Sequence, residues 1–284
     1  MSIIVTGASG QLGRLVIEEL LTSVPAAEVT AVVRDPAKGT DLTARGVTLA
    51  VADYNSPESL DGLLRAGDRV LLISGNEFHR DRTAQHKAVL GAAVKAGAAL
   101  FAYTSAPGSQ GGPVTDDHRA TEDAILASGI PYSLLRNGLY HEMATMNIPA
   151  ALQHGALVRA AGNGRLASAS RADYAAAAAA VLSGDGQEDT VYELTGDTAW
   201  SFAEFAAEVS RQSGRHLPYH AVTGEEYAAM LSGTGLPGQL AHIMAGIDAS
   251  IAAGELAHTT GDLSRLAGRP TTPVADAIAA ALAA

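Results

Sequence analysis

The stretch Ile3-Ile4-Val5-Thr6-Gly7-Ala8-Ser9-Gly10-Gln11-Leu12-Gly13 decides the fold of this chain. Its first four residues form a short apolar run, which is typical of a strand buried on both faces. Three glycines follow at G-x-x-G-x-x-G spacing, and apolar residues then recur at helical spacing as far as Leu20. A strand, a glycine turn and a helix in this order predict a dinucleotide site.

Each glycine of this turn has a physical purpose. Gly7 allows a tight turn, Gly10 lets backbone N–H groups approach a pyrophosphate, and Gly13 lets the helix pack close to the strand. The helix N-terminus adds unpaired N–H donors and the positive end of the helix dipole. We therefore expect the cofactor to be bound by Gly7, Ala8, Ser9, Gly10, Gln11 and Leu12.

Strands and helices alternate along the first half of the chain. Apolar strands are expected at residues 29–33, 47–52, 69–73, 100–104 and 132–136, with long helices at 80–96 and 117–128. Residues 105–115 are rich in Gly, Pro and Ser and are expected to form a loop. Repeated βαβ units predict an α/β fold with a Rossmann-like, doubly wound parallel sheet and ligands at the carboxyl ends of its strands.

This alternation loosens from about Asn137 onward. Helices are expected at residues 173–182, 225–231, 237–252 and 272–284, and a strand at 190–194. We expect an NAD(P)-binding domain over residues 1–136 and a smaller, mostly helical C-terminal lobe over residues 137–284. This lobe would form the substrate site and could return strands to the sheet. The later helices could bury a partner through Ile243, Met244, Ile247 and Ile251, so both a monomer and a homodimer remain open.

Composition narrows the classes of function. The 284 residues carry a formal net charge of −11, which argues against a nucleic-acid or anionic-membrane partner. No apolar run reaches the ~18 residues of a membrane span, and the early first strand leaves no room for a signal peptide, so we expect a cytoplasmic protein. The chain has no cysteine, and its nine histidines show no metal-ligand spacing. We expect neither a metal nor a flavin.

The end of the second strand reads the adenosine ribose of a dinucleotide. An acid there binds the 2′-hydroxyl of NAD, whereas an arginine accommodates the 2′-phosphate of NADP. Arg34 comes directly off the strand, before Asp35, and Lys38 lies one turn further on, which favours NADP(H) but leaves NAD(H) open. Further cofactor contacts are expected after the other strands, at Asp53, Tyr54, Ser74, Gly75, Tyr103, Thr104 and Asn137.

The catalytic residues are less obvious. Short-chain dehydrogenases commonly use Tyr-x-x-x-Lys, but none of the three lysines of this chain stands four residues after a tyrosine. His118 and Glu122 share one helical face and could pair, which would place a histidine that holds or donates a proton near the nicotinamide. Tyr140 is a second candidate. Ordinary surface pairing of His118 and simple packing of Tyr140 remain the alternatives.

Several motifs together resemble the NmrA-like group of atypical short-chain dehydrogenases, and most of all the bacterial type 2 NAD(P)H:quinone oxidoreductases. The resemblance implies a Rossmann-like NADPH domain, a small C-terminal domain and hydride transfer to quinones without the Tyr-Lys dyad. The motifs span nearly the whole chain in order: Thr6 to Gly13, Val33 to Lys38, Leu71 to Ser74, Ala102 to Ser105, Tyr132 to Gly138, Ser168 to Tyr174 and Gly268 to Thr272.

Three functions are compatible with these residues. The first is an NADPH-dependent reductase of a quinone-like small molecule, in which water can protonate the hydroquinone anion and His118 is helpful but not essential. The second keeps the cofactor and reduces an activated C=C bond or a dye-like cation. The third is a non-catalytic NADP(H)-sensing regulator that acts through a protein partner.

Overall fold

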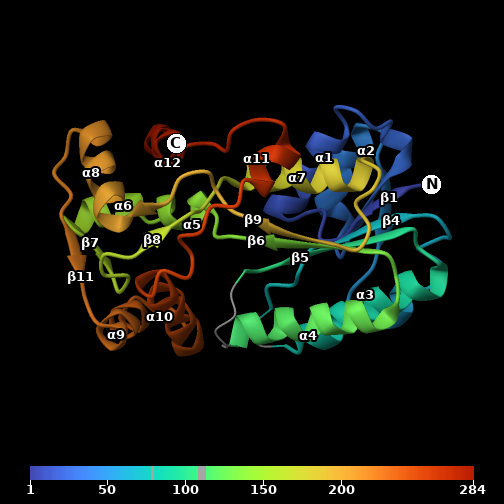
Figure 1. Ribbon diagram of the computed structural model, residues 1–284, viewed down its shortest axis with the longest axis horizontal. Helices are drawn as coiled ribbons and strands as arrows, with labels where there is room; N and C mark the ends of the chain where they lie inside the picture. Colours follow the sequence, from blue (N-terminus) through green and yellow to red (C-terminus); the bar gives the residue numbers. More distant parts are fainter. Residues whose placement is uncertain (78–79, 108–112) are drawn as a thin grey trace.

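The computed structural model describes residues 1–77, 80–107 and 113–284. Within these ranges the main sheet has seven parallel strands in the order β3-β2-β1-β4-β5-β6-β9 (Figure 1). The chain runs outward from β1 and then returns to place β4 beside β1, which is the strand order of a doubly wound sheet with its ligand crevice at that reversal. The Rossmann-like expectation is confirmed. The strands are β1 (Ile3–Val5), β2 (Val29–Val33), β3 (Thr48–Val51), β4 (Arg69–Leu72), β5 (Leu100–Ser105), β6 (Tyr132–Asn137) and β9 (Thr190–Leu194).

Helices cover both faces of this sheet (Figure 1). One face carries α1 (Gln11–Leu20), α7 (Arg171–Ser183) and α11 (Asp262–Ala267), and the other carries α3 (Arg82–Ala96) and α4 (Pro113–Ser128). Helix α4 begins earlier than the sequence suggested, so residues 113–115 of the expected loop are helical. The rest of that loop, 108–112, lies outside the described residues. The connections contain α2 (Thr40–Ala44), η1 (Ala26–Glu28), η2 (Pro36–Gly39) and η3 (Pro57–Leu60).

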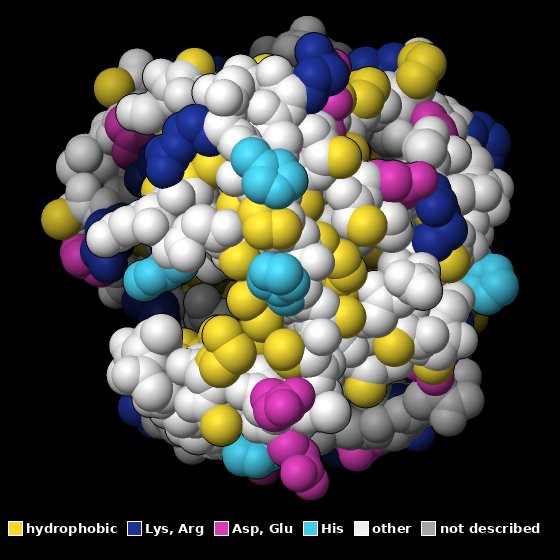
Figure 2. Space-filling view, turned by 90° about the vertical axis from the view of Figure 1, so that its left-hand side faces the viewer, with side chains coloured by type: hydrophobic (Ala, Val, Ile, Leu, Met, Phe, Trp, Pro, Cys, Tyr) yellow, Lys and Arg dark blue, Asp and Glu magenta, His cyan; other side chains and the backbone are white. Residues whose placement is uncertain are grey.

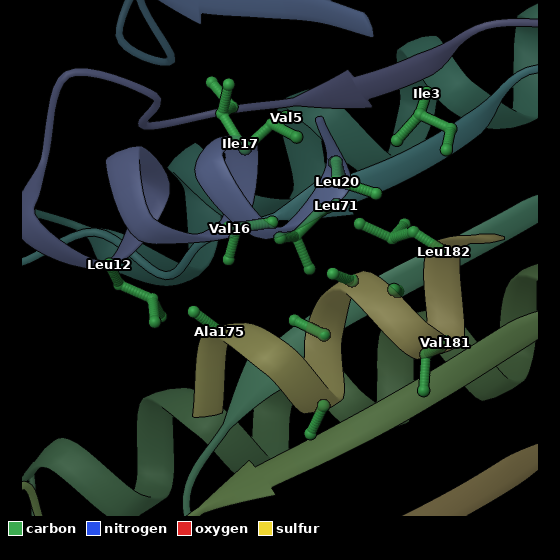
Figure 3. Close-up of a cluster of buried hydrophobic side chains, with 14 of the residues drawn as sticks. Ile3, Val5, Leu12, Val16, Ile17, Leu20, Leu71, Ala175, Val181 and Leu182 are labelled. Atoms are coloured by element: carbon green, nitrogen blue, oxygen red, sulfur yellow. The ribbon is translucent and has the colours of Figure 1, made fainter. Parts of the chain in front are cut away.

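The strands are apolar on both sides because each side packs against helices. Along β1, Ile3 and Val5 join the cluster under α1 and α7, while Ile4 joins the opposite cluster with residues of α3 and α4. Figure 3 shows Leu12 and Val16 of α1 facing α7 near its first turns. The alanines of α7 are small enough to let the two helices approach closely, so its alanine-rich sequence serves helix packing.

The C-terminal part of the chain forms a smaller, mostly helical lobe at one end of the sheet (Figure 1). Its core is built around Trp200, Phe202 and Phe205, and a buried ion pair joins Arg159 to Asp248 of α10 with Nε–Oδ2 at 2.9 Å. Strand β9 and helices α7 and α11 come from beyond residue 136 but lie on the main sheet. The lobe comprises α5 (His141–Thr145), α6 (Ile148–His154), β7 (Leu157–Arg159), β8 (Arg165–Leu166), β10 (Trp200–Ser201), α8 (Phe202–Ser213), β11 (Tyr219–Ala221), α9 (Gly224–Gly233), α10 (Gly238–Ala252) and α12 (Val274–Ala283).

The outer end of this lobe shows hydrophobic side chains gathered near its centre with histidines among them (Figure 2). The sequence suggested that four apolar residues of α10 could bury a partner. One of them, Ile251, is fully buried in the core of the lobe itself, and Ile247 packs against that core. This half of the apolar stripe is therefore already covered by the same chain. No helix within the described ranges is both long enough and apolar enough to cross a membrane.

Gly13 provides a test of the close packing between α1 and β1. A Cβ atom at this position would lie 2.4 Å from the Gly7 carbonyl oxygen and 2.8 Å from the Ala8 Cα, and both are backbone atoms that cannot turn aside. We expect Gly13→Ala to lower the free energy of unfolding by about 1–3 kcal/mol, measured by urea denaturation. Gly91→Ala in α3 is the control, since nothing lies within 4 Å of its added Cβ. It should stabilise by up to about 1 kcal/mol. An unchanged midpoint for Gly13→Ala would contradict the close packing.

Candidate cofactor cleft and active site

A cleft of about 450 Å³ opens at the carboxyl ends of β1, β2, β3 and β4. The glycine turn forms its floor: Gly7 adopts a left-handed φ of +62°, and its carbonyl accepts the Gly10 N–H at 2.9 Å. Gly10 is the N-cap of α1 and has no side chain, so the first-turn N–H groups of the helix are available to a ligand. Gly7 lines this cleft. So do four further residues of the turn that the sequence predicted to bind the cofactor: Ser9, Gly10, Gln11 and Leu12.

One side of this cleft carries the charged residues that follow β2 and β3. Arg34 is 58% exposed and reaches across the cleft to Glu77, with Nη1 and Oε1 2.7 Å apart. The hydrogen bond that Arg34 donates to Glu77 raises the pKa of Arg34 and lowers the pKa of Glu77 to about 2. Asp53 is turned toward the neighbouring loop, where its carboxylate accepts the Asn55 side-chain amide at 2.9 Å.

Tyr54 closes the bottom of this cleft. Its hydroxyl donates to the Thr6 Oγ1 at 2.5 Å, and the Thr6 hydroxyl donates in turn to the Leu71 carbonyl of β4. Burial raises the pKa of Tyr54. The tyrosine therefore ties the end of β3 to the strands on either side of the sheet reversal and acts as a neutral wall.

Residues from beyond β6 also line the first cleft. Tyr140 lines it, packs edge-on against Tyr174 at 5.3 Å between ring centroids, and lies under the Arg171 guanidinium, whose Cζ is 4.7 Å from the ring centroid. The sequence analysis missed Arg171 as a site residue. The signal that could have found it is the capping box of Ser170 and Asp173, which fixes Arg171 as the first residue of α7.

A second cleft, of about 740 Å³, lies along the ends of β5, β6 and β9. Its apolar wall contains Leu139, Leu166 and Leu256. Gly138 and Leu139 line this cleft while the next residue, Tyr140, lines the first one, so the same short segment borders both. Charged and titratable side chains complete the lining: His118, Arg119, Glu122, Arg136, Glu193, Glu255 and His258.

His118 belongs to a buried chain of hydrogen bonds that connects the two clefts. Its Nδ1 lies 2.7 Å from the Tyr103 hydroxyl, which is 3.3 Å from the Nδ1 of His86. His86 accepts the Gly75 backbone N–H through Nε2 at 3.0 Å, so its own proton resides on Nδ1, facing the Thr121 hydroxyl. Gly75 lines the first cleft and His118 the second, so this chain fixes the two walls relative to each other.

Burial keeps both histidines of this chain neutral. Loss of hydration, together with the charge of Arg82, lowers the pKa of His118 to about 4 and that of His86 to about 3. Burial also raises the pKa of Tyr103, whose side chain is 0% exposed. At neutral pH this region therefore holds no imidazolium and no phenolate.

The pairing of His118 with Glu122 that helical spacing suggested is wrong. Glu122 instead receives Arg136 in a bidentate contact, at 3.0 Å from Nε and 2.6 Å from Nη2, and the Ser105 hydroxyl at 2.5 Å. Arg136 also contacts Glu193 of β9 at 2.7 Å. A guanidinium offers a carboxylate two parallel, charge-assisted hydrogen bonds, which a neutral imidazole cannot match.

Several predicted cofactor residues do not line the first cleft. The Ala8 N–H is taken by the Val32 carbonyl at 3.2 Å, and Lys38 is exposed outside the cleft. Tyr103 points into the α3–α4 side of the sheet, and the Thr104 hydroxyl is used to hold the Ser74 N–H at 2.9 Å. Ser74 and Gly75 do line the cleft, as does Asn76, which the sequence analysis did not select. Asn137 lies buried at the end of β6.

The first cleft fits a dinucleotide. The glycine turn leaves little room for a side chain at the helix N-cap, since a Cβ on Gly10 would lie 3.1 Å from the Gly7 carbonyl oxygen. Among the described residues that line this cleft, Gln85 has a buried side-chain oxygen, Oε1, with no hydrogen-bond partner. Buried polar atoms without partners are rare and mark places where a ligand can complete the bonding. No group of three or more His, Asp or Glu residues in the described ranges could hold a metal ion.

A glycine turn at the reversal of a doubly wound sheet, an open helix N-terminus and a covered cleft together define a dinucleotide-binding protein of the Rossmann class. The chain belongs to the NAD(P)H-binding family, whose sequence profile matches residues 7–185. Quinone oxidoreductase 2 of Escherichia coli (strain K12) is 45% identical over 278 residues, which are 97% of each chain.

Two solved structures extend this comparison. The NADPH-dependent quinone oxidoreductase of Escherichia coli complexed with NADPH matches with a TM-score of 0.95 and 44% identity over 99% of each chain. The triphenylmethane reductase of Citrobacter sp. matches with a TM-score of 0.94 and 37% identity over 100% of each chain. The resemblance to bacterial type 2 quinone oxidoreductases is confirmed.

The buried histidine chain predicts a pH dependence of stability. The folded-state pKa of His118 lies below its ordinary value of 6.5, so the unfolded chain binds the proton first as the pH falls. The stabilisation is complete above pH 6.5 and is lost toward pH 4, by up to about 1.4 kcal/mol per pH unit for this histidine. Urea unfolding across this range should show a shallower decline for His118→Asn, which keeps a polar atom for Tyr103 and cannot be protonated. Equal slopes would contradict a neutral His118.

Proposed function

We propose that the chain is an NADPH-dependent reductase that transfers hydride to a quinone-like acceptor in the second cleft. The observation that carries the proposal is the segment Gly138–Tyr140, which borders both the cofactor cleft and the second cleft. With the adenosine held at Arg34, Ser74 and Tyr140 would hold the nicotinamide end of a bound dinucleotide in the same cleft. An acceptor bound at the end of the second cleft beside Gly138 and Leu139 would then lie next to the nicotinamide, as direct hydride transfer requires.

The residues present suit hydride transfer without an enzymatic acid. Bound NADPH would supply the hydride, and a quinone that accepts it becomes a hydroquinone anion stabilised by aromaticity. The protein's part is to bind and orient both molecules and to exclude water, for which Leu139, Leu166 and Leu256 are suited. His118 is neutral, and its ring nitrogens contact the Tyr103 hydroxyl and the Arg82 guanidinium, so water supplies the last proton.

A dye-like cation is a second candidate acceptor. The Citrobacter relative is a triphenylmethane reductase. In this chain the second cleft contains three carboxylates, those of Glu122, Glu193 and Glu255, against two guanidinium groups. An excess of negative charge favours a cationic acceptor. The regulator alternative has no support, because the relatives that match nearly the whole chain carry the names of reductases.

Turnover tests the proposal directly. Purified protein should consume NADPH, followed by its absorbance, when mixed with small quinones, and cationic triphenylmethane dyes should be tested in parallel. Activity with NADPH should exceed activity with NADH if Arg34 binds the 2′-phosphate. Tight binding of NADPH with no turnover on any quinone or dye would contradict the reductase proposal.

Substitution of His118 tests whether this residue donates the proton in the reaction. We expect His118→Ala to lower kcat/KM for a quinone by less than about tenfold, which corresponds to ~1.4 kcal/mol of transition-state stabilisation. The reason is that a neutral, buried imidazole supplies a hydrogen bond but is not the required acid. The measurement is the quinone assay across pH 5–8 with folding checked by circular dichroism. A loss of about a thousandfold would identify His118 as the proton donor.

A further inference from the structure

We propose that Glu77 sets the cofactor selectivity of this protein by opposing the preference of Arg34 for a 2′-phosphate. The inference rests on the proposed use of a nicotinamide dinucleotide and goes further, since it assigns a role to a carboxylate at the mouth of the cofactor cleft. Glu77 was not among the residues that the sequence pattern selected. It follows β4 by five residues and meets Arg34, which is 43 positions earlier in the chain.

The carboxylate of Glu77 is held in place by donors on several sides. Its Oε1 accepts from Arg34 at 2.7 Å, and its Oε2 accepts from the side-chain amides of Gln85 at 3.0 Å and Asn55 at 3.4 Å. Arg80 lies 3.6 Å from the same Oε2. Gln85 is itself only 4% exposed and anchored in α3, so it fixes the carboxylate from the protein side. These contacts fix the position of Glu77 in the wall of the cleft.

The charge of Glu77 persists at every pH at which the protein would work. The Arg34 hydrogen bond and the two amide contacts keep the pKa of Glu77 at about 2, despite the opposing effect of burial. A 2′-phosphate bound by Arg34 must therefore approach a fixed negative charge. A 2′-hydroxyl, in contrast, is neutral and readily donates a hydrogen bond to a carboxylate. Glu77 therefore weakens the binding of NADP(H), which carries the 2′-phosphate, and does not weaken the binding of NAD(H).

The neighbouring acids strengthen this argument. Asp53 also lines the cleft, and its charge contributes to raising the pKa of Arg34. At least two carboxylates, those of Glu77 and Asp53, therefore offset the positive charge of Arg34 before a dinucleotide binds. The preference for NADPH over NADH should be correspondingly modest, and removing the charge of Glu77 should increase it.

Binding measurements on Glu77→Gln test this role without turnover. The amide keeps the size of the side chain and its acceptor oxygen, but loses the charge. Isothermal titration should show NADP⁺ binding about three- to tenfold more tightly than to the wild type, while NAD⁺ binding stays unchanged or weakens. The gain should diminish at high salt and disappear when Arg34→Ala is added. Glu225→Gln, at an exposed position of α9, controls for the change in overall charge and should leave both affinities unaltered.

The outcomes distinguish this inference from the proposed function. Weaker NADP⁺ binding by Glu77→Gln would show that Glu77 orients Arg34 toward the phosphate, and an unchanged ratio of the two affinities would show that it has no part in selectivity. Either result overturns the inference and leaves the reductase proposal intact. Wild-type protein that binds neither dinucleotide would instead overturn the proposed function.

Discussion

The contact between the Gly7 carbonyl and the backbone of Gly13 is the constraint on which the rest of the structure depends. It sets α1 directly against β1, and no side chain can be inserted between them. The alanine-rich α7 then packs on α1, and α7 begins at Arg171, beside Tyr140. The glycine turn therefore also determines, through two layers of packing, where Tyr140 and Arg171 lie at the same cleft.

A second constraint is the buried polar chain on the opposite face of the sheet. Tyr103 projects from β5 between α3 and α4, and a buried hydroxyl must find partners or destabilise the fold. His86 and His118 supply them, one from each helix. The same bonds hold the Gly75 N–H in one cleft and present His118 to the other. The hydrogen bonds that satisfy the buried Tyr103 hydroxyl thus also fix the two clefts of the candidate site relative to each other.

The sequence predicted the fold well because its signals are local. The Gly7–Gly13 turn and the apolar strands each depend on a few adjacent residues, and the structure contains all of them. The candidate site was predicted less well because its contacts join distant segments. Helical spacing placed His118 and Glu122 on one face, but the competing partner, Arg136, lies on a strand that spacing within the helix cannot reveal. Glu77 and Arg171 became visible only when separate loops met around one cleft.

The two candidates for an acid, His118 and Tyr140, are both poorly suited to donating a proton at neutral pH. His118 is already deprotonated, and burial raises the pKa of Tyr140, which makes its phenol a weaker acid than usual. Such a site favours acceptors whose hydride adducts need no proton from the protein in the same step. A quinone gives a stabilised anion, and a triphenylmethane cation gives a neutral product with no proton at all. Two similar structures are named as a quinone oxidoreductase and a triphenylmethane reductase, and the acceptors in both names have this chemical property. The absence of the Tyr-Lys dyad from the sequence and the low pKa of His118 are then two aspects of one chemistry, in which the acceptor, not the enzyme, stabilises the charge.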